Sequence, residues 1–357
     1  MKKATKLFSK RFALLISVSA LVLSLVSGCG KGEDQAAQQP SAQQPSADDP
    51  LAQFPALTFP YKEDPNATLA EYKDGKLTGK EFASFLRTLN FMNPQEGMMI
   101  EAADKASLEN YMHQYLATKI LAERADDKTK AASKELGEKS FEQIKTQYLS
   151  LLGGDEAKFT KLMEQQKITK DEVVGMMAAI NDSVEVLDKK LTDEELKAEY
   201  DKQLKADKNA FTIASVRHIL ILTENRKPEE ALKIANDLEG KLKKGEDFAT
   251  LAKEHSEDPG SKNNGGLYKD AYVNQWVPEF KEAALTQKID EIGPPVKTSY
   301  GYHIIRVESR SDKTFDQVKE ELRKKALPDQ FEKFVKEDMD KLVTAWHVPE
   351  VTQPAKS

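Results

Sequence analysis

The sequence predicts an α+β fold in which a small antiparallel sheet, surrounded by helices, is inserted in an all-helical body. Two short apolar runs, residues 216–222 and 301–307, are rich in β-branched residues and have the length of strands. Helical patterns and a glycine-rich loop lie between them, so we expect His218 and His303 to meet on one sheet. Long stretches before and after these runs show the apolar spacing of amphipathic helices.

The first element, residues 1–28, has the pattern of a secretory signal peptide. Basic residues precede an uncharged run over residues 12–26, which is shorter than the about twenty apolar residues of a membrane-spanning helix. The ending Val26-Ser27-Gly28-Cys29 resembles the lipobox of bacterial lipoproteins, in which the cysteine is acylated. Cys29 is the sole cysteine, so an internal disulfide is excluded and a free thiol is the alternative. We expect a lipid anchor at Cys29 that holds the protein on the extracytoplasmic side of the cell membrane.

Residues 29–56 are expected to form a disordered linker. Gln, Ala, Pro and Ser dominate this segment, and the pentad Gln38-Gln39-Pro40-Ser41-Ala42 repeats directly. About twenty such residues span roughly 25 Å. The linker would therefore hold the folded part away from the membrane.

Residues 57–209 are expected to form a helical chaperone domain that begins with a hairpin. Asp74-Gly75 supplies the hairpin turn, and Thr78 with Glu81 forms a capping box for the first helix. Further helices are predicted over residues 106–125, 130–152, 155–166, 170–190 and from 192 to 204. Methionines concentrate here, and in the adjacent pairs Met98-Met99 and Met176-Met177 at least one member is expected to be exposed in a groove; ordinary core packing is the alternative.

Residues 210–310 carry a series of short motifs in a fixed order. The motifs are His218-Ile219-Leu220, Gly245-Glu246-Asp247-Phe248-Ala249, Ser256-Glu257-Asp258-Pro259-Gly260-Ser261, Gly265-Gly266-Leu267, Val277-Pro278-Glu279-Phe280, Pro295-Val296-Lys297-Thr298 and Gly301-Tyr302-His303-Ile304-Ile305. This order resembles the parvulin family of peptidyl-prolyl cis/trans isomerases. The resemblance implies catalysed rotation about X-Pro amides, whose barrier is about 18–20 kcal/mol. That reaction needs no metal and no cofactor.

The resemblance also assigns candidate site residues by position. The implied catalytic group is His218, Asp258, Thr298 and His303, and the implied wall for the proline ring is Leu267, Trp276 and Phe280. The alternatives are that the histidines and aromatic residues are core residues and that Asp258 serves a turn. Leu267-Tyr268 replaces the usual Asp-Leu, and Trp276 the usual methionine. Arg226 and Lys227 stand among acidic residues, so we expect no phosphate requirement.

Residues 311–348 are predicted to form a C-terminal helix that returns to the helical domain, followed by a disordered tail over residues 349–357. The order of helices resembles the chaperone part of PrsA-like foldase lipoproteins and of the SurA type. The net charge of −6 argues against a nucleic-acid partner.

The expected function is therefore an extracytoplasmic folding factor that isomerises X-Pro bonds in secreted proteins and acts as a chaperone on unfolded, proline-containing chains. A holdase with an inactive parvulin-like domain is the alternative. A solute-capturing lipoprotein would need two α/β lobes, which the helical segment disfavours.

Overall fold

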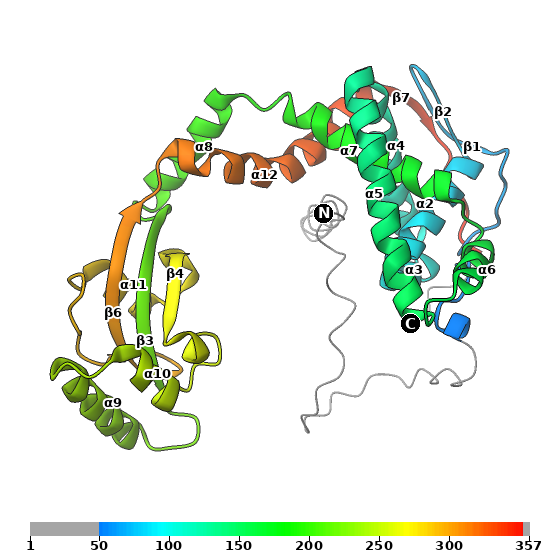
Figure 1. Cartoon of the computed structure of the whole chain (residues 1–357). Helices are drawn as coiled ribbons and strands as arrows, with labels where there is room; N and C mark the ends of the chain where they lie inside the picture. Colours follow the sequence, from blue (N-terminus) through cyan, green and yellow to red (C-terminus); the bar gives the residue numbers. More distant parts are fainter. Residues whose placement is uncertain (1–49, 353–357) are drawn as a thin grey trace. The chain divides into compact units, whose positions relative to one another are not determined.

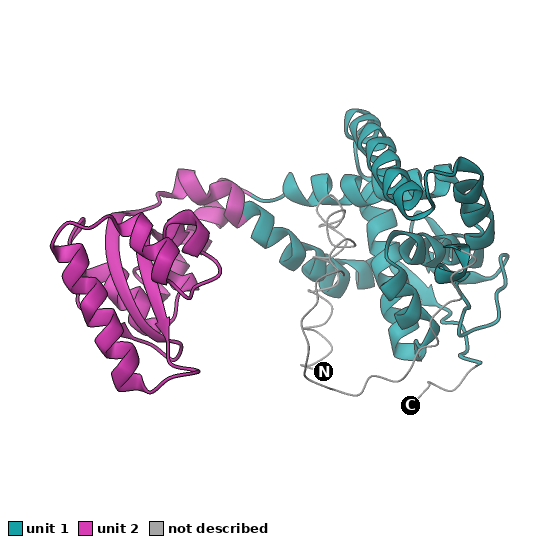
Figure 2. Ribbon diagram, turned by 60° about the horizontal axis from the view of Figure 1, so that its bottom comes forward, with its two compact units in different colours: residues 1–191, 323–357 teal, residues 192–322 magenta. Residues whose placement is uncertain are grey.

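The computed structural model describes residues 50–352, and these residues form two compact units (Figures 1 and 2). The first unit consists of the described residues up to 191 and from 323 onward, and the second of residues 192–322. The predicted α+β fold class is confirmed, with the second unit inserted in the sequence between two parts of the first. The first unit is mainly helical but is not all-helical as predicted, because it contains a three-stranded sheet. The predicted signal peptide and the lipid anchor at Cys29 lie outside the described residues. No helix within residues 50–352 is long and apolar enough to cross a membrane.

The first unit is built from helices that begin at polar caps. Thr78 and Glu81 form the predicted capping box at the start of the first long helix, and Thr169 and Glu172 form another. The elements are η3 (Pro50–Gln53), β1 (Thr68–Tyr72), β2 (Gly75–Thr78), α2 (Gly79–Met92), α3 (Pro94–Glu101), α4 (Lys105–Glu123), α5 (Asp127–Leu151), α6 (Glu156–Gln166) and α7 (Lys170–Asp188).

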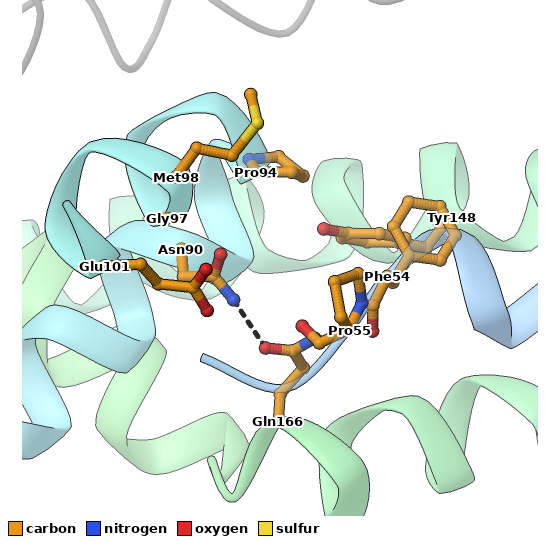
Figure 3. A pocket seen from close by; sticks show the side chains of 9 residues that line it. All are labelled: Phe54, Pro55, Asn90, Pro94, Gly97, Met98, Glu101, Tyr148 and Gln166. Carbon is orange, nitrogen blue, oxygen red and sulfur yellow. Dashed lines mark hydrogen bonds between the residues drawn. The ribbon is translucent and has the colours of Figure 1, made fainter. Parts of the chain in front are cut away.

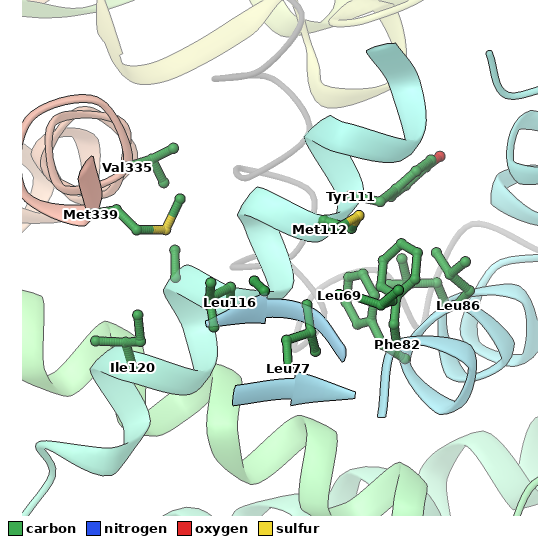
Figure 4. Close-up of a cluster of buried hydrophobic side chains, with 14 of the residues drawn as sticks. Leu69, Leu77, Phe82, Leu86, Tyr111, Met112, Leu116, Ile120, Val335 and Met339 are labelled. Atoms are coloured by element: carbon green, nitrogen blue, oxygen red, sulfur yellow. The ribbon is translucent and has the colours of Figure 1, made fainter. Parts of the chain in front are cut away.

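The larger core of this unit forms around α4, which presents Met112, Leu116 and Ile120 to the β1–β2 hairpin and to the C-terminal segment (Figure 4). Val335 and Met339 from that segment lie in the same cluster. Burial of each such side chain stabilises the unit by about 1.5–3 kcal/mol relative to exposure. The C-terminal segment is therefore part of the first unit's core.

The adjacent methionines behave differently from one another. Met98 and Met99 are exposed, with 66% and 47% of their surface accessible. Met176 and Met177 are both buried, contrary to the expectation for that pair, because α7 lies between two separate apolar clusters and each methionine faces one of them. Of the two adjacent methionine pairs, only the pair in α3 is therefore exposed.

The disordered linker was predicted to reach residue 56, and this is wrong from residue 50 onward. Residues 50–53 form a short 3-10 helix, and Phe54 is buried in the second apolar cluster of the first unit. Leu51 packs against the same cluster. These are the first large apolar side chains after the Gln-, Ala-, Pro- and Ser-rich stretch, and their burial offsets the entropy lost on ordering.

The C-terminal end is also more complex than the predicted single helix. α12 (Phe315–Lys333) passes into a π turn, η6 (Phe334–Asp338), a 3-10 turn, η7 (Met339–Lys341), and a strand, β7 (Val343–Trp346). β7 pairs with β1 to give the order β2-β1-β7. The disordered tail expected over residues 349–357 is wrong for residues up to 352, because Thr352 N donates to Pro60 O at 2.8 Å. The pairing of β7 with the edge of β1 satisfies backbone hydrogen-bonding groups on both strands.

The second unit contains the predicted sheet, whose four strands run antiparallel in the order β4-β3-β6-β5. Its elements are α8 (Asp193–Ala206), β3 (Thr212–Leu222), α9 (Pro228–Lys243), α10 (Phe248–His255), η4 (Lys262–Asn264), β4 (Leu267–Tyr272), η5 (Val273–Gln275), α11 (Pro278–Thr286), β5 (Val296–Lys297) and β6 (Gly301–Asp312). α9 and α10 pack on one face of the sheet, and α11 packs on the other.

Candidate active site

The centre of the site is a pair of histidines on the two central strands. β3 and β6 pair so that Leu220 stands opposite His303 and His218 stands opposite Ile305, which places the two histidines diagonally on one face. Their Nδ1 atoms are 3.1 Å apart, and their rings stack with centroids separated by 5.3 Å. Both side chains are buried, so each histidine provides the other's polar partner inside the sheet.

The hydrogen-bonded chain continues beyond each histidine. Thr298 Oγ1 lies 3.0 Å from His303 Nε2, and Asp258 Oδ2 lies 3.0 Å from His218 Nε2. An ionised carboxylate only accepts hydrogen bonds, so His218 Nε2 carries a proton that it donates to Asp258. Thr298, His303, His218 and Asp258 thus form one continuous chain, and the structure brings together all four residues that the resemblance assigned as catalytic.

Asp258 is held as a carboxylate by several donors. Besides His218, the hydroxyl of Ser261 donates to Asp258 Oδ2, and Tyr268 OH donates to the same atom at 3.0 Å. The hydrogen bond from His218 is the largest cause of a pKa well below the usual range of an aspartate, and the bond from Ser261 adds to it. Oδ2 is therefore saturated, whereas Oδ1 has one long contact, from Gly260 N at 3.4 Å.

The neighbouring groups are held neutral. Burial, aided by repulsion from His218, lowers the pKa of His303 to about 3. Burial, together with its hydrogen bond to Asp258, raises the pKa of Tyr268 to about 12. Asp258 therefore keeps its negative charge at neutral pH, with the neutral phenol of Tyr268 bonded to it and neutral His303 further along the hydrogen-bonded chain.

An aromatic wall lies next to this polar chain. The Phe280 ring meets the rings of both His218 and His303 edge to face, with centroids 5.2 Å apart in each case. Trp276 packs against Phe280 at 5.0 Å. Both come from the segment that enters α11, whose apolar residues cover this face of the sheet.

Leu267 does not join this wall, although the resemblance implied that it would. Across the β3–β4 ladder Leu267 stands opposite Arg217, whereas Tyr268 stands opposite Val216, which shares the face of His218. Successive strand residues point to opposite faces, so Tyr268 is the residue on the site face. Its ring stacks on His218 with centroids 5.3 Å apart.

Sequence reasoning also missed Ser261 as a partner of Asp258 and His218. Ser261 Oγ is fully buried and lies 2.9 Å from His218 Nε2. It appeared among the matching motif residues, and its position three residues after Asp258 was the one available signal. Which side chains of this short loop bond to Asp258 and His218 depends on the backbone conformation of the folded loop, which the sequence does not show.

Backbone contacts fix the loop that carries Asp258. Glu257 N donates to Leu220 O at 2.9 Å, and His218 N donates to Gly266 O at 2.9 Å, so both ends of the loop are bonded to β3. A Cβ at Gly266 would lie 2.3 Å from His218 O, and the residue has a φ of +77°. Glycine is therefore required there for the close approach to the strand that carries His218.

The chemistry offered by this site is electrostatic. Within residues 50–352 there is no cluster of His, Cys, Asp and Glu that could hold a metal ion. The reactive features are a fixed carboxylate with one available oxygen and an aromatic wall beside it. Such a site can bind an apolar ring and act on a polar group of the same ligand without forming a covalent bond.

Comparisons with known proteins agree with this geometry. Residues 202–311 match the model of the PPIC-type PPIase domain. Foldase protein PrsA of Caldanaerobacter subterraneus is 37% identical over 237 residues, which are 66% of this chain and 68% of that protein. Foldase protein PrsA of Geobacillus kaustophilus is 31% identical over 72% of this chain and 77% of its own length. Foldase protein PrsA 3 of Bacillus cereus is 34% identical over 71% and 73%.

The matches to foldases extend well beyond the isomerase domain and include a large part of the helical unit. The protein therefore combines a peptidyl-prolyl cis/trans isomerase domain with a chaperone-type role in protein folding, and it belongs to the PrsA foldase family.

Proposed function

We propose that the second unit rotates X-Pro bonds of secreted, unfolded polypeptides by electrostatic destabilisation of the planar amide, with Asp258 as the catalytic residue. In a planar amide, resonance places negative charge on the carbonyl oxygen and positive charge on the nitrogen. Rotation interrupts the resonance and reduces both charges. A carboxylate near the carbonyl oxygen therefore raises the energy of the planar amide more than that of the twisted one, which lowers the barrier.

The observation that carries this proposal is the pattern of hydrogen bonds to Asp258. Three donors hold Oδ2, and Oδ1 is the oxygen left to face a ligand. Because donors to Oδ2 also hold the pKa low, the charge persists without a bound cation. In this proposal His218, His303 and Thr298 are positioning residues that fix the carboxylate.

The aromatic wall supports the same function by binding the proline ring. Phe280 and Trp276 offer apolar surface directly beside the histidine pair, and Tyr268 closes the side next to Asp258. Removing water from the reacting amide strengthens the effect of a nearby charge, since the local dielectric constant falls. Proline specificity would then come from the wall and rate enhancement from the carboxylate.

Two variants test the role of the Asp258 charge. Asp258→Asn removes the charge and keeps the shape, and Asp258→Ala removes both. Each should lower kcat/KM for a short Ala-Pro peptide by about ten- to a hundredfold, which is roughly 1.4–2.7 kcal/mol of transition-state stabilisation. The readout is the exchange rate between the cis and trans NMR signals of the peptide.

Asp237→Asn is a matched control, because it removes an exposed aspartate from α9 in the same unit. It should retain the parent rate. If Asp258→Asn is as fast as the parent, the carboxylate charge has no part in catalysis. If the parent itself does not accelerate exchange, the second unit serves as a binding platform and the holdase reading replaces the isomerase one.

We further propose that the mature chain is anchored through lipid on Cys29 and acts outside the cytoplasmic membrane. The support is the sequence alone, namely the leader and the Val26-Ser27-Gly28-Cys29 ending. Cys29→Ala should leave the protein in the aqueous phase of a detergent phase separation, whereas the parent enters the detergent phase. Partition of Cys29→Ala into detergent would contradict the anchor. Circular dichroism should be the same for both forms, because Cys29 belongs to none of the described helices and strands.

A further inference from the structure

Residues 50–55, at the start of the described chain, lie against the helices of the first unit as a bound peptide would. Phe54 is 9% exposed, and its ring meets that of Tyr148 edge to face with centroids 5.1 Å apart (Figure 3). Tyr148 in turn stacks on Phe91 at 4.9 Å, and its hydroxyl donates to Phe91 O at 2.6 Å. An aromatic pocket thus receives the side chain of the residue that follows the short 3-10 helix η3.

The backbone of this segment is held by side-chain amides. Phe54 O accepts hydrogen bonds from Gln165 Nε2 at 2.8 Å and from Gln166 Nε2 at 2.9 Å. Gln166 Nε2 also donates to Pro55 O at 2.8 Å. Carbonyl groups are common to every polypeptide. This clamp, formed by Gln165 and Gln166, therefore recognises the backbone of a bound chain and not its side chains.

The Gln166 part of this clamp is also held by a side chain of the first unit outside the segment. Asn90 Nδ2 donates to Gln166 Oε1 at 2.6 Å, and both side chains belong to buried residues. This bond directs the Gln166 amide nitrogen toward the carbonyl groups (Figure 3). A buried amide aimed at a backbone site is costly unless a carbonyl group occupies that site.

The pocket continues beyond the segment that occupies it. A small hollow, open to solvent, remains beside Phe54 and Pro55, and Pro94, Gly97, Met98 and Glu101 complete its lining. Met98 and its neighbour Met99 are two of the few large apolar side chains that residues 50–352 expose. Flexible thioether side chains adapt to ligands of different shape, as a site for many polypeptides requires.

We propose that this pocket, formed by residues of α2, α3, α5 and α6, binds segments of unfolded polypeptides that carry an aromatic residue followed by proline. Residues 50–55 are its tethered occupant, which a client displaces. This inference rests on the proposed function, because it assigns the client site of the chaperone-type activity to the first unit. It requires no change in the isomerase site of the second unit.

A tethered occupant competes at an effective concentration that reaches the millimolar range for a short connection. The apparent affinity of a free peptide for the parent protein is therefore its intrinsic affinity multiplied by the fraction of molecules in which the pocket is open. Phe54→Ala removes the side chain that anchors the occupant. The variant should bind a free peptide at least about tenfold more tightly, provided that the occupant closes the pocket in nine molecules of ten.

The first experiment measures this affinity directly. The probe is a fluorescein-labelled peptide with the sequence of residues 50–57, and binding to the full-length parent and to Phe54→Ala is followed by fluorescence anisotropy. The same peptide with alanine in place of its phenylalanine is the control and should bind neither protein. Gln165→Ala, added to Phe54→Ala, should weaken binding because one donor to the peptide carbonyl is lost. Equal affinity of parent and Phe54→Ala for the probe overturns the proposal.

The second experiment uses the unmodified protein, so it holds even if Phe54→Ala unfolds. Excess unlabelled probe should displace residues 50–55 and speed hydrogen–deuterium exchange in a fragment that contains them, since the Phe54 amide is bonded to Leu51 O at 3.0 Å in the closed form. Unchanged exchange at a probe concentration that saturates binding would overturn the proposal. Isomerisation of an Ala-Pro peptide, measured in parallel, should be the same in parent and Phe54→Ala. If neither the parent nor Phe54→Ala binds the probe while both isomerise the Ala-Pro peptide, this inference alone is refuted. If the parent does not isomerise that peptide, the proposed function is refuted.

Discussion

His303 makes the second unit sensitive to acid, and the size of the effect follows from its burial. The unfolded chain takes up a proton on this imidazole near pH 6.5, whereas in the folded protein the pKa falls to about 3. Between these values the unfolded state binds more protons, so acid favours unfolding. The stability contributed by neutral His303 is fully present above pH 6.5 and is lost as the pH falls toward 3.

The expected loss between pH 7 and pH 5 is about 2 kcal/mol, since each pKa unit corresponds to about 1.4 kcal/mol. Asp258 contributes little in this window, because its folded pKa lies below that of an unfolded aspartate and its stabilisation is lost only at lower pH. His303→Gln keeps one donor and one acceptor and does not titrate. The variant should therefore lose about 2 kcal/mol less than the parent over the same interval.

The two tryptophans make it possible to follow the second unit by itself. Trp276 lies beside the candidate active site, and Trp346 lies in β7 of the first unit. Urea unfolding in a Trp346→Phe background, followed by fluorescence of Trp276, reports the unfolding of the second unit at pH 7 and at pH 5. If parent and His303→Gln lose equal stability between the two pH values, His303 is not held neutral by its surroundings.

Two other predictions concern the specificity of the site. Phe280→Ala should raise KM for proline peptides and destabilise the second unit by about 3–5 kcal/mol in urea unfolding, because the ring is 4% exposed and contacts both histidines; unchanged KM would place the proline ring elsewhere. A phosphoserine-proline peptide should be isomerised no faster than the matching alanine-proline peptide, because Arg226 already pairs with Glu257 through bonds of 2.8 and 2.6 Å. A large preference for the phosphopeptide in NMR exchange would contradict this.

Local sequence patterns predict much of the fold. The strands that carry His218 and His303 contain the short β-branched runs that predicted them, and the capping pairs at Thr78 and Thr169 start helices where the sequence indicated. Each of these features depends on residues a few positions apart, so the chain order suffices to predict it. The order of motifs around Asp258 likewise placed that residue near the histidine pair.

Contacts between distant segments required the tertiary structure. The pairing of β7 with β1 joins residues that are more than two hundred positions apart, and the burial of Phe54 depends on aromatic residues from α2 and α5. An apolar residue beside a polar linker carries no local sign of the pocket that will receive it. Pattern reasoning therefore extended the linker too far and continued the last helix through a strand.

The assignment of Leu267 shows how small a structural difference can decide a site. Leu267 and Tyr268 are neighbours, and both are compatible with an apolar wall. The strand register places Tyr268 opposite Val216 and Leu267 opposite Arg217. Because side chains alternate between the two faces of a sheet, a shift of one residue exchanges a site residue for one on the other face. The sequence by itself predicted a candidate site around His218 and His303, and the register decided that Tyr268 and not Leu267 lies on the same face of the sheet.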